Sequence, residues 1–489
     1  MKTGWNNTDR WVLGLSLIVW LLLLFVAYKL SEPKPPYFIT ILPVGFAGLY
    51  LAIRDFERFL YLMVAMVPMS AAVRDIGGGI GAALPAEGML LISAGGFVLL
   101  LLSGKLEIPP GILKHPLTIA IGLQTLWICV TILSSTHLSV SVKFLVARLI
   151  YLVVFFIGIG ILVYRNGDGV RFFRNYLLGF FPIMIYALIT LGSLGFSRKF
   201  SPVMAEPFFD DHTLLGVCLS MVLPVTWFLF RQKELVLRII RPINFGWVIM
   251  ILVPLTLYMS FSRAAWLGVF VILGFYLLIR LKVKFSWILG VLLLVVAVGW
   301  LNQETLLAKM EQNRNVSGED VVSTMGSVTN LNSDDSNLER INRWACAIRM
   351  AEEQPWLGFG PGTYEREYGP FQAIHQRTRI STNNGDRGDA HSEYLGALSE
   401  QGIPGMVLLV IVFMTSIWTG LRIVYQDKNP KKVGLAIAIL LGLSSYYMHG
   451  FVNDFLDLDK AATLFWGMLG VLVAMDVARI DQKTVDSGE

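Results

Sequence analysis

The sequence has few cysteines and few charges for its length. Three of its 489 residues are cysteines, and only 15% are charged. Cys129, Cys218 and Cys346 show no CxxC or paired spacing, so neither a disulfide framework nor a thiolate metal site is indicated, and packing accounts for all three. There is also no Walker motif, no Rossmann glycine pattern and no Gly-x-Ser-x-Gly elbow. Energy from nucleotide hydrolysis is therefore not expected.

What the chain does contain is long apolar runs. Hydrophobic residues make up 55% of it, and its mean hydropathy is +0.62. Runs such as WVLGLSLIVWLLLLFVAY and FSWILGVLLLVVAVGW reach or approach the roughly 18 residues that allow a helix to cross the hydrocarbon layer. We therefore predict an all-α polytopic membrane protein with about 12–14 transmembrane helices and one large, partly helical outer loop.

The apolar runs define the expected spans and three regions. The spans run approximately over 11–30, 37–53, 57–72, 88–104, 116–134, 143–164, 172–194, 212–230, 244–260, 263–280, 285–301, 404–424, 433–451 and 460–478. The first reads as a retained span and not as a removed signal peptide, because no small-residue cleavage site follows it. Residues 1–301 thus form an N-terminal bundle of about eleven spans, residues 302–403 a polar loop, and residues 404–489 the last helices and a tail.

Lysine and arginine are distributed unevenly between the connecting segments. With the N-terminus in the cytoplasm, one side of the membrane receives Arg54, Arg58, Lys105, Lys114, Arg165, Arg171, Arg174, Arg231, Lys233, Arg238, Arg241, Arg280, Lys282, Lys284, Lys428, Lys431 and Lys432. The short loops on the other side are much poorer in these residues. The positive-inside rule then predicts both termini in the cytoplasm and the polar loop outside.

The polar loop divides into two parts. Residues 302–337 are rich in Ser, Asn, Asp and Gly, which is typical of a flexible segment. After Leu338, helical spacing places several apolar residues on one face: Ile341, Trp344, Ala345 and Ile348. We expect this helix to stop before Pro355 and to be followed by the turn-dense segment WLGFGPG.

The segment GDAHSEYLGALSEQGIPG, residues 388–405, resembles a capped helix. Asp389 is a suitable N-cap, and Gly402 with Pro404 forms a stop signal. His391 would then lie in the first helical turn, where the positive end of the helix dipole disfavours the imidazolium form. A neutral imidazole can act as a general base. The alternative is an ordinary surface histidine in a polar loop.

Four arginines could bind an anion. Arg263 lies at the outer edge of a span, and Arg148 lies about one and a half turns inside one. Arg340 and Arg343 are one helical turn apart and could share a face. A guanidinium binds phosphate oxygens bidentately and stays charged. Snorkelling explains the first two equally well, and exposure to water explains the other two.

A metal site is a weaker alternative. FFDDHT (residues 208–213) and HGFVNDFLDLDK (residues 449–460) contain His212, His449 and several aspartates that could supply N and O ligands. Their spacings match no ligand signature, and helix capping by the aspartates is the ordinary explanation. We predict no metal.

Three segments, in order, resemble the O-antigen ligase and O-antigen polymerase superfamily of bacterial envelope enzymes. SFSRAAWLG resembles its Ser-Arg motif at the start of a span, and RINRWACAIRMAEEQPWLGFGPGTY resembles its Arg-x-x-x-Trp helix with Pro-x-x-Gly-x-Gly after it. HSEYLGALSEQGIPG resembles its histidine motif. The resemblance covers roughly residues 205–475. It departs at Asp211-His212, where many members have Pro-Asn, which leaves the role of His212 open.

The resemblance implies a reaction at the outer, periplasmic face of the bacterial inner membrane. A glycan on undecaprenyl pyrophosphate would be transferred to an acceptor hydroxyl without a metal, a nucleotide or any other cofactor. His391 would be the base, while Arg263 and Arg340 would bind the pyrophosphate. We place Arg343 and Arg148 with the binding residues and treat the remaining residues of interest as supporting: Asp389, Glu393, Tyr394 and His212.

The resemblance leaves the acceptor open. It could be another lipid-linked glycan, as for a polymerase, or lipid A core or a protein, as for a ligase. Other envelope polysaccharide assembly proteins and membrane lipids are expected partners, and nucleic acid is not. A transporter of a small anion such as bicarbonate is the alternative function. Transporter sites usually lie near the bilayer midplane, whereas the candidate residues here gather at the outer face.

Overall fold

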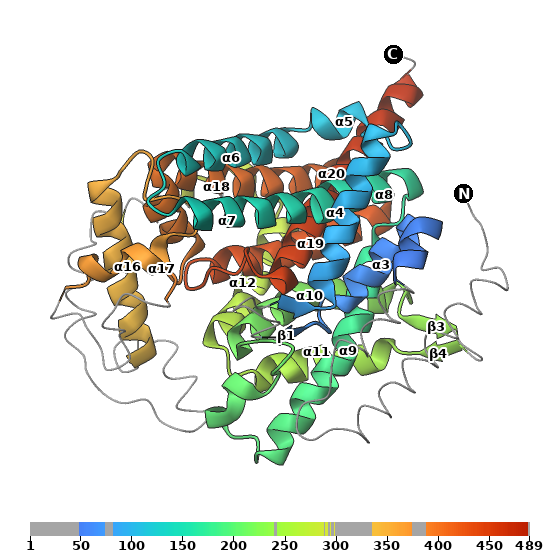
Figure 1. The fold of residues 1–489 in the computed structure, drawn as a ribbon. Coiled ribbons are helices and arrows are strands. Elements are labelled where there is room, and N and C mark those ends of the chain that lie inside the picture. Colours follow the sequence, from blue (N-terminus) through green and yellow to red (C-terminus); the bar gives the residue numbers. More distant parts are fainter. Residues whose placement is uncertain are drawn as a thin grey trace.

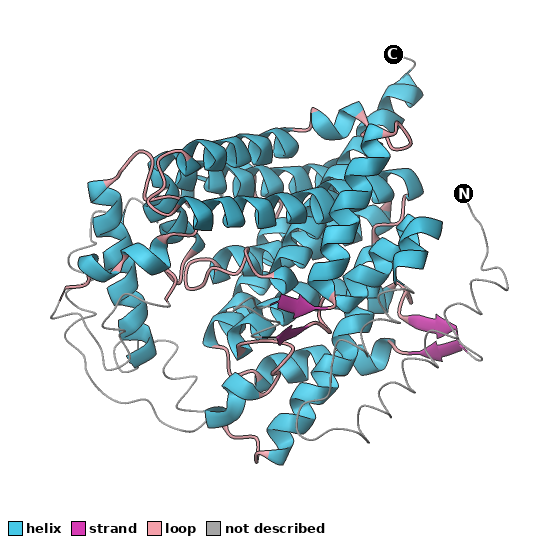
Figure 2. Ribbon diagram, in the orientation of Figure 1, coloured by secondary structure: helices cyan, strands magenta, loops and turns pink. Residues whose placement is uncertain are grey.

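The computed structural model describes residues 48–73, 82–238, 242–287, 289–291, 294, 298, 335–373 and 388–487. Most of this part is helical, with little strand (Figures 1 and 2). The strands form two short antiparallel pairs. β1 (Ala71–Val73) pairs with β2 (Ala82–Leu84), with Ala72 opposite Ala83. β3 (Val236–Arg238) pairs with β4 (Pro242–Asn244), with Leu237 opposite Ile243.

The helices follow the expected spans closely. In chain order they are α3 (Phe56–Met66), α4 (Ala86–Leu102), α5 (Pro110–Leu113), α6 (Pro116–Ile132), α7 (Leu138–Tyr151), the π-helical segment η1 (Leu152–Gly158), α8 (Ile159–Asn166), α9 (Val170–Ser193), the 3-10 helix η2 (Arg198–Val203), α10 (His212–Arg231), α11 (Gly246–Met259), α12 (Arg263–Arg280), α16 (Asp335–Glu353), α17 (Tyr364–Glu367), η3 (Gly369–Phe371), α18 (Glu393–Gln426), α19 (Pro430–His449) and α20 (Asp459–Ser487).

Seven of the described helices are long and apolar enough to cross a membrane. They are Leu138–Asn166, Val170–Ser193, His212–Arg231, Arg263–Arg280, Glu393–Gln426, Pro430–His449 and Asp459–Gln482. The helices α4, α6 and α11 are shorter apolar helices. This confirms the prediction of an all-α polytopic membrane protein. The expected span 11–30, most of 37–53 and part of 285–301 lie outside the described residues.

Helix α20 forms the centre of the bundle, since 94% of its apolar window is buried. It packs against α8, η1 and α18. Small residues permit this close packing, because a side chain at Gly470 would place its Cβ 2.4 Å from the carbonyl oxygen of Phe156 in η1. A Cβ added at Gly442 of α19 would lie equally close, 2.4 Å, to the carbonyl oxygen of Met221 in α10. The apolar core is therefore built by helices whose backbones approach directly.

The long helix α18 bends where the sequence predicts a stop. At Gly402 the backbone has φ 71° and ψ −176°, so two helical halves meet there. The turn-dense segment after α16 is fastened to this bend, since Ile403 N donates to Pro355 O (2.8 Å) and Phe359 N donates to Ser399 O (3.1 Å). The first half of α18 and the polar loop are thereby held together at one end of the bundle.

Replacing Gly402 by alanine should destabilise the protein strongly. Its backbone conformation is essentially restricted to glycine, and an added Cβ would lie 2.2 Å from the carbonyl oxygen of Trp356. We expect a loss of about 3 kcal/mol or more in free energy of unfolding, measured as a lower unfolding temperature in detergent. Gly274→Ala in α12 is the control, because nothing lies within 4 Å of its added Cβ. Equal unfolding temperatures for the two variants would refute this account of the bend.

Candidate functional site

Most of the candidate residues gather at one end of the bundle. Figure 1 shows α16 and α17 at this end, while the C-terminus lies at the other. Helix α16 packs against α18, and its end before Pro355 agrees with the prediction. The segment 450–458 between α19 and α20 also reaches this end, because Glu393 N donates to Gly450 O (2.8 Å). Three segments far apart in the sequence thus surround His391.

His391 is held by Asp389. Its Nδ1 lies 2.7 Å from Asp389 Oδ1, and its backbone N donates to the same oxygen (3.0 Å). The prediction that Asp389 caps the helix is wrong, since Ser392 is the N-cap and His391 precedes it. His391 has φ +47°, a left-handed conformation that is uncommon outside glycine and is often found at functional sites. Its side chain remains about one-third exposed (32%).

A second acidic residue, Asp454, joins this pair. Burial would raise the pKa of Asp389, but the hydrogen bond and charge of His391 and a hydrogen bond with Asp454 lower it to about 2. Burial and the neighbouring charge of Asp389 raise the pKa of Asp454 well above its ordinary value. Asp389 is therefore the more acidic of the two carboxyl groups, and Asp454 keeps its proton to a higher pH, in its hydrogen bond to Asp389. No local sequence signal distinguishes Asp454 from the other acidic residues of its loop.

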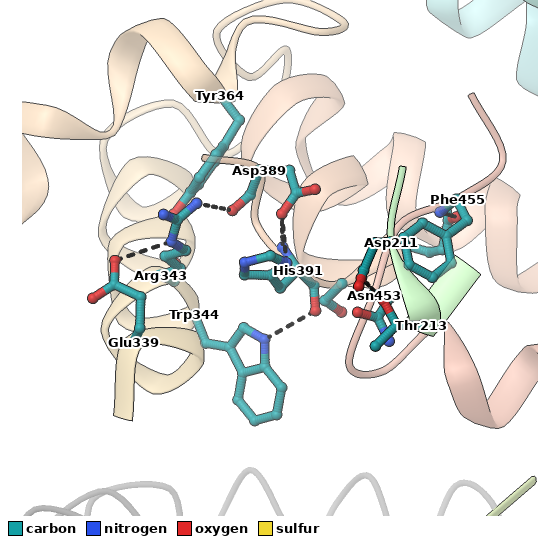
Figure 3. A network of polar contacts seen from close by, with 12 residues as sticks. Asp211, Thr213, Glu339, Arg343, Trp344, Tyr364, Asp389, His391, Asn453 and Phe455 are labelled. Carbon is teal, nitrogen blue, oxygen red and sulfur yellow. Dashed lines mark hydrogen bonds and ion pairs between the residues drawn. The ribbon is translucent and has the colours of Figure 1, made fainter. Parts of the chain in front are cut away.

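Helix α16 fixes the turn that carries His391 (Figure 3). Arg343 Nε donates to Glu339 (3.1 Å) and its Nη1 donates to the carbonyl oxygen of Asp389 (3.1 Å). Trp344 Nε1 donates to the carbonyl oxygen of His391 (3.3 Å), and Tyr364 OH donates to that of Arg343 (2.7 Å). Arg343 is buried and bonded on both sides, so it holds the turn that carries His391, and the expectation that it binds the pyrophosphate stays a prediction.

Arg340 lies one turn earlier on α16, near the start of α10. Burial raises the pKa of Asp211, but the hydrogen bond and charge of His212 bring it below its ordinary value. The charge of Arg340 lowers it further. His212 Nδ1 lies 2.6 Å from Asp211 Oδ1. Figure 3 shows Asp211 and Asn453 on the opposite side of His391 from Arg343. Arg340 and His212 are thus brought to the same end of the bundle as His391.

Arg263 is the first residue of α12, after the N-cap Ser262. It is half-buried. The first turn of α12 lies against α10, because a Cβ on Gly216 would lie 2.9 Å from Ser262 Cβ. Since α10 begins at His212, Arg263 lies at the end of the bundle that carries His212. The position expected for Arg263, at the edge of a span, is the one observed.

Arg148 is buried and has an acidic partner. Its Nη2 lies 2.8 Å from Asp457 Oδ1, and its guanidinium lies 5.3 Å from the rings of both Phe144 and Trp466. It lines a cavity of about 150 Å³ together with Asp389 and Asp454. Arg148 therefore contributes a positive charge to the lining of the cavity next to Asp389.

The glutamates of α18 support the backbone around the site. Glu393 is buried and accepts hydrogen bonds from Tyr446 OH, Phe455 N and Leu456 N. Glu400 accepts from Gly362 N (2.8 Å) and Tyr364 N (3.0 Å), in agreement with its structural interpretation.

Tyr394 has a similar supporting position. Its OH donates to the carbonyl oxygen of Tyr447 in α19 (2.9 Å). The side chain thereby ties the first turn of α18 to the end of α19. These contacts place Tyr394 and the two glutamates as supports of the site's framework.

The described residues include one cluster that could hold a metal ion. It comprises Asp389, His391 and Asp454, whose ligand atoms all lie within 4.8 Å of one another. The sequence had instead suggested His212 and His449. His449 is directed elsewhere, because its Nδ1 pairs with Asn453 Nδ2 at 3.1 Å. The same three side chains also suit proton transfer, since an imidazole with one nitrogen bound to a carboxylate has the other available as a base.

Comparisons with known proteins agree with the motifs. Residues 248–410 match the sequence profile of a family described as O-antigen ligase. The matched segment contains Arg263, Arg340, Arg343, Asp389 and His391. The chain is also 25% identical over 338 residues to an uncharacterized protein of Haemophilus influenzae strain Rd, in an alignment that covers 63% of this chain and 79% of that protein. The resemblance to the O-antigen ligase and polymerase superfamily is thereby confirmed.

Proposed function

Starting from a membrane chain whose residues 248–410 match the O-antigen ligase family, we propose that it transfers a glycan from a polyprenyl pyrophosphate to an acceptor hydroxyl. The observation that carries this proposal is the His391–Asp389 pair at 2.7 Å within the matched segment. The donor would be an undecaprenyl-pyrophosphate-linked glycan, and the site would face the periplasm of a bacterial inner membrane.

His391 would act as the general base. With Nδ1 bound to Asp389, Nε2 is the nitrogen that can accept the proton of the acceptor hydroxyl. As the oxygen attacks the anomeric carbon, the bond from that carbon to the pyrophosphate oxygen breaks and the polyprenyl pyrophosphate leaves. The Asp389 carboxylate stabilises the imidazolium that forms. Attack from the side opposite the leaving group inverts the anomeric centre.

Arg263 and Arg340 would stabilise the leaving group. Pyrophosphate departure places negative charge on its oxygens, and fixed guanidinium groups lower the energy of that charge. Both arginines lie at the end of the bundle that carries His391, and Arg263 lies at the edge of a span. A lipid-linked donor is held by the membrane, so its pyrophosphate reaches the protein at this level. The position of Arg263 supports this role.

The decisive assay uses purified protein and an undecaprenyl-pyrophosphate glycan. We expect turnover in the presence of EDTA, and Arg263→Ala should reduce kcat/KM about a hundredfold. Arg280→Ala is the matched control, because Arg280 is the last residue of the same helix, at its opposite end, and is exposed. Longer lipid-linked glycans without another acceptor would identify a polymerase. Consumption of donor only with lipid A core or a protein acceptor would identify a ligase.

Three outcomes would contradict parts of the proposal. No turnover by folded protein with any acceptor would reject the transferase and favour the anion transporter. Loss of turnover in EDTA that is restored by a divalent cation would replace the metal-free base mechanism with a cation at Asp389, His391 and Asp454, whose atoms are close enough to bind one. Equal activity in Arg263→Ala and Arg280→Ala would remove Arg263 from the site.

A further inference from the structure

A second cavity lies at the opposite end of α12 and α18 from His391. It has a volume of about 520 Å³ and is lined by Lys282, Lys284, Phe285, Trp418, Arg422 and Tyr425, among others. Because α12 has 18 residues and rises about 1.5 Å per residue, this cavity lies roughly 27 Å from Arg263 along the helix. That separation approximates the thickness of the hydrocarbon layer, so the cavity lies at the other membrane surface. We call it the basic cavity.

The charge of the basic cavity has one sign. Lys282, Lys284 and Arg422 line it, and none of the described residues that line it is acidic. Among the described residues, neither lysine has an ion-pair partner, and both are exposed. Arg422 pairs with Asp476, but Arg479 binds the same carboxylate (2.7 Å). An excess of positive charge therefore remains around the cavity.

Aromatic side chains give the basic cavity an apolar wall. The guanidinium of Arg422 lies 4.3 Å from the Trp418 ring, which fixes both groups. Tyr425 OH lies 3.5 Å from the carbonyl oxygen of Ile279, which ties α18 to the end of α12. Aromatic residues at this depth are typical of the boundary between hydrocarbon and water. The cavity thus combines cations with groups suited to a membrane interface.

The surface beside the basic cavity is apolar and exposed. Leu277 in the last turn of α12 is 56% exposed, Leu281 directly after the helix is 65% exposed, and Trp287 is 68% exposed. Such side chains face lipid acyl chains in a membrane protein. A free phosphate would use only the cations, whereas a phospholipid would use the cations and this apolar surface together. The lysines also belong to the side that the positive-inside rule assigns to the cytoplasm, where anionic lipids attract basic residues.

We propose that the basic cavity binds the head group of an anionic phospholipid. Its phosphate would lie between Lys282, Lys284 and Arg422, its glycerol against Trp418, and its acyl chains along Leu277 and Leu281. The site is independent of glycan transfer, because it lies at the other end of the bundle. Bound lipid would join the end of α12 to the end of α18, the two helices whose opposite ends carry Arg263 and His391.

Lipid binding to the purified, delipidated full chain tests this proposal. Native mass spectrometry in detergent would titrate phosphatidylglycerol and phosphatidylcholine with the same acyl chains. For Lys282→Gln/Lys284→Gln we expect phosphatidylglycerol affinity to fall about 25-fold, roughly fivefold for each lysine, and phosphatidylcholine affinity to stay unchanged. The matched control is Lys105→Gln/Lys428→Gln, which removes two exposed lysines predicted on the same side. Equal unfolding temperatures would establish that both double variants are folded.

Each other result would overturn a defined part of the proposal. Equal affinity of the wild type for the two lipids would mean that the lysines only stabilise the C-terminal end of α12. Equal losses in the two double variants would mean a general surface charge effect without a site. Displacement of phosphatidylglycerol by an excess of inorganic phosphate, with no contribution from acyl chains, would show a free-anion site and would reject the lipid.

Discussion

Replacing His391 by glutamine is expected to reduce kcat/KM for glycan transfer about a thousandfold, because general base catalysis contributes about 10²–10⁴. Glutamine has a similar reach and can still accept a hydrogen bond from the acceptor hydroxyl, but it cannot take up the proton at neutral pH. Donor binding should change by less than about threefold, since the arginines supply that interaction. Single-turnover transfer and equilibrium binding of the lipid-linked donor would measure the two quantities separately.

His137→Gln is the matched control for this prediction. His137 precedes α7 at the same end of the bundle, is 39% exposed and pairs with Glu367 at 3.1 Å. His137 therefore resembles His391 in its exposure and in having an acidic partner, but its partner is Glu367 and not Asp389. If both glutamine variants lost activity equally, the effect would come from general disturbance of this surface. If neither lost activity, His391 would not be the base.

Local sequence signals predicted most helices and the ends of α12 and α16, but not the start of α18. Helix α12 has the predicted bounds, Arg263 to Arg280, because a Ser-Arg hairpin and a basic end enclose an apolar run. Helix α16 ends before Pro355 as predicted, since proline cannot continue a helix. The cap at Asp389 was wrong by three residues. Both Asp389 and Ser392 are good N-caps, but Ser392 is the one whose Oγ accepts from Leu395 N (3.4 Å), and the same Oγ also donates to Gly450 O (3.2 Å), a contact remote in sequence.

Long-range partners could not be predicted from one sequence. Arg148 and Asp457 are 309 residues apart, and nothing local distinguishes Asp457 from the other acidic residues of its loop. The same holds for Asp454, which lies beside Asp389 in a loop whose backbone at Phe455 and Leu456 donates to Glu393. Spacing rules describe neighbours within a helix, whereas these contacts depend on how α18, α19 and α20 pack. The motif alone was thus enough to propose His391 as the base, whereas its second acidic neighbour required the fold.

Replacing Asp389 by asparagine should reduce kcat about a thousandfold with little change in KM, because the charge that stabilises the imidazolium is lost while the hydrogen-bonding shape is kept. Acid unfolding supplies a readout independent of transfer. The folded pKa of Asp389, about 2, is below its ordinary value of 3.8, so its stabilisation is present above pH 4 and is lost as the pH falls from about 4 to 2. The variant should lack this loss. An unchanged kcat would exclude Asp389 from catalysis.

Asp454→Asn and Asp454→Ala test whether the hydrogen bond from Asp454 to Asp389 contributes to activity. Burial and the charge of Asp389 raise the pKa of Asp454, so the folded protein keeps a proton that the unfolded chain releases above about pH 4. The stability contributed by this group therefore falls as the pH rises through that range.

Asparagine at position 454 can donate to Asp389 without this cost. The Asp454→Asn variant should therefore unfold at an equal or higher temperature at pH 7, with activity within about threefold of wild type. Alanine leaves Asp389 without this donor and should reduce activity about tenfold. Equal activities of Asp454→Asn and Asp454→Ala would show that His391 depends on Asp389 alone.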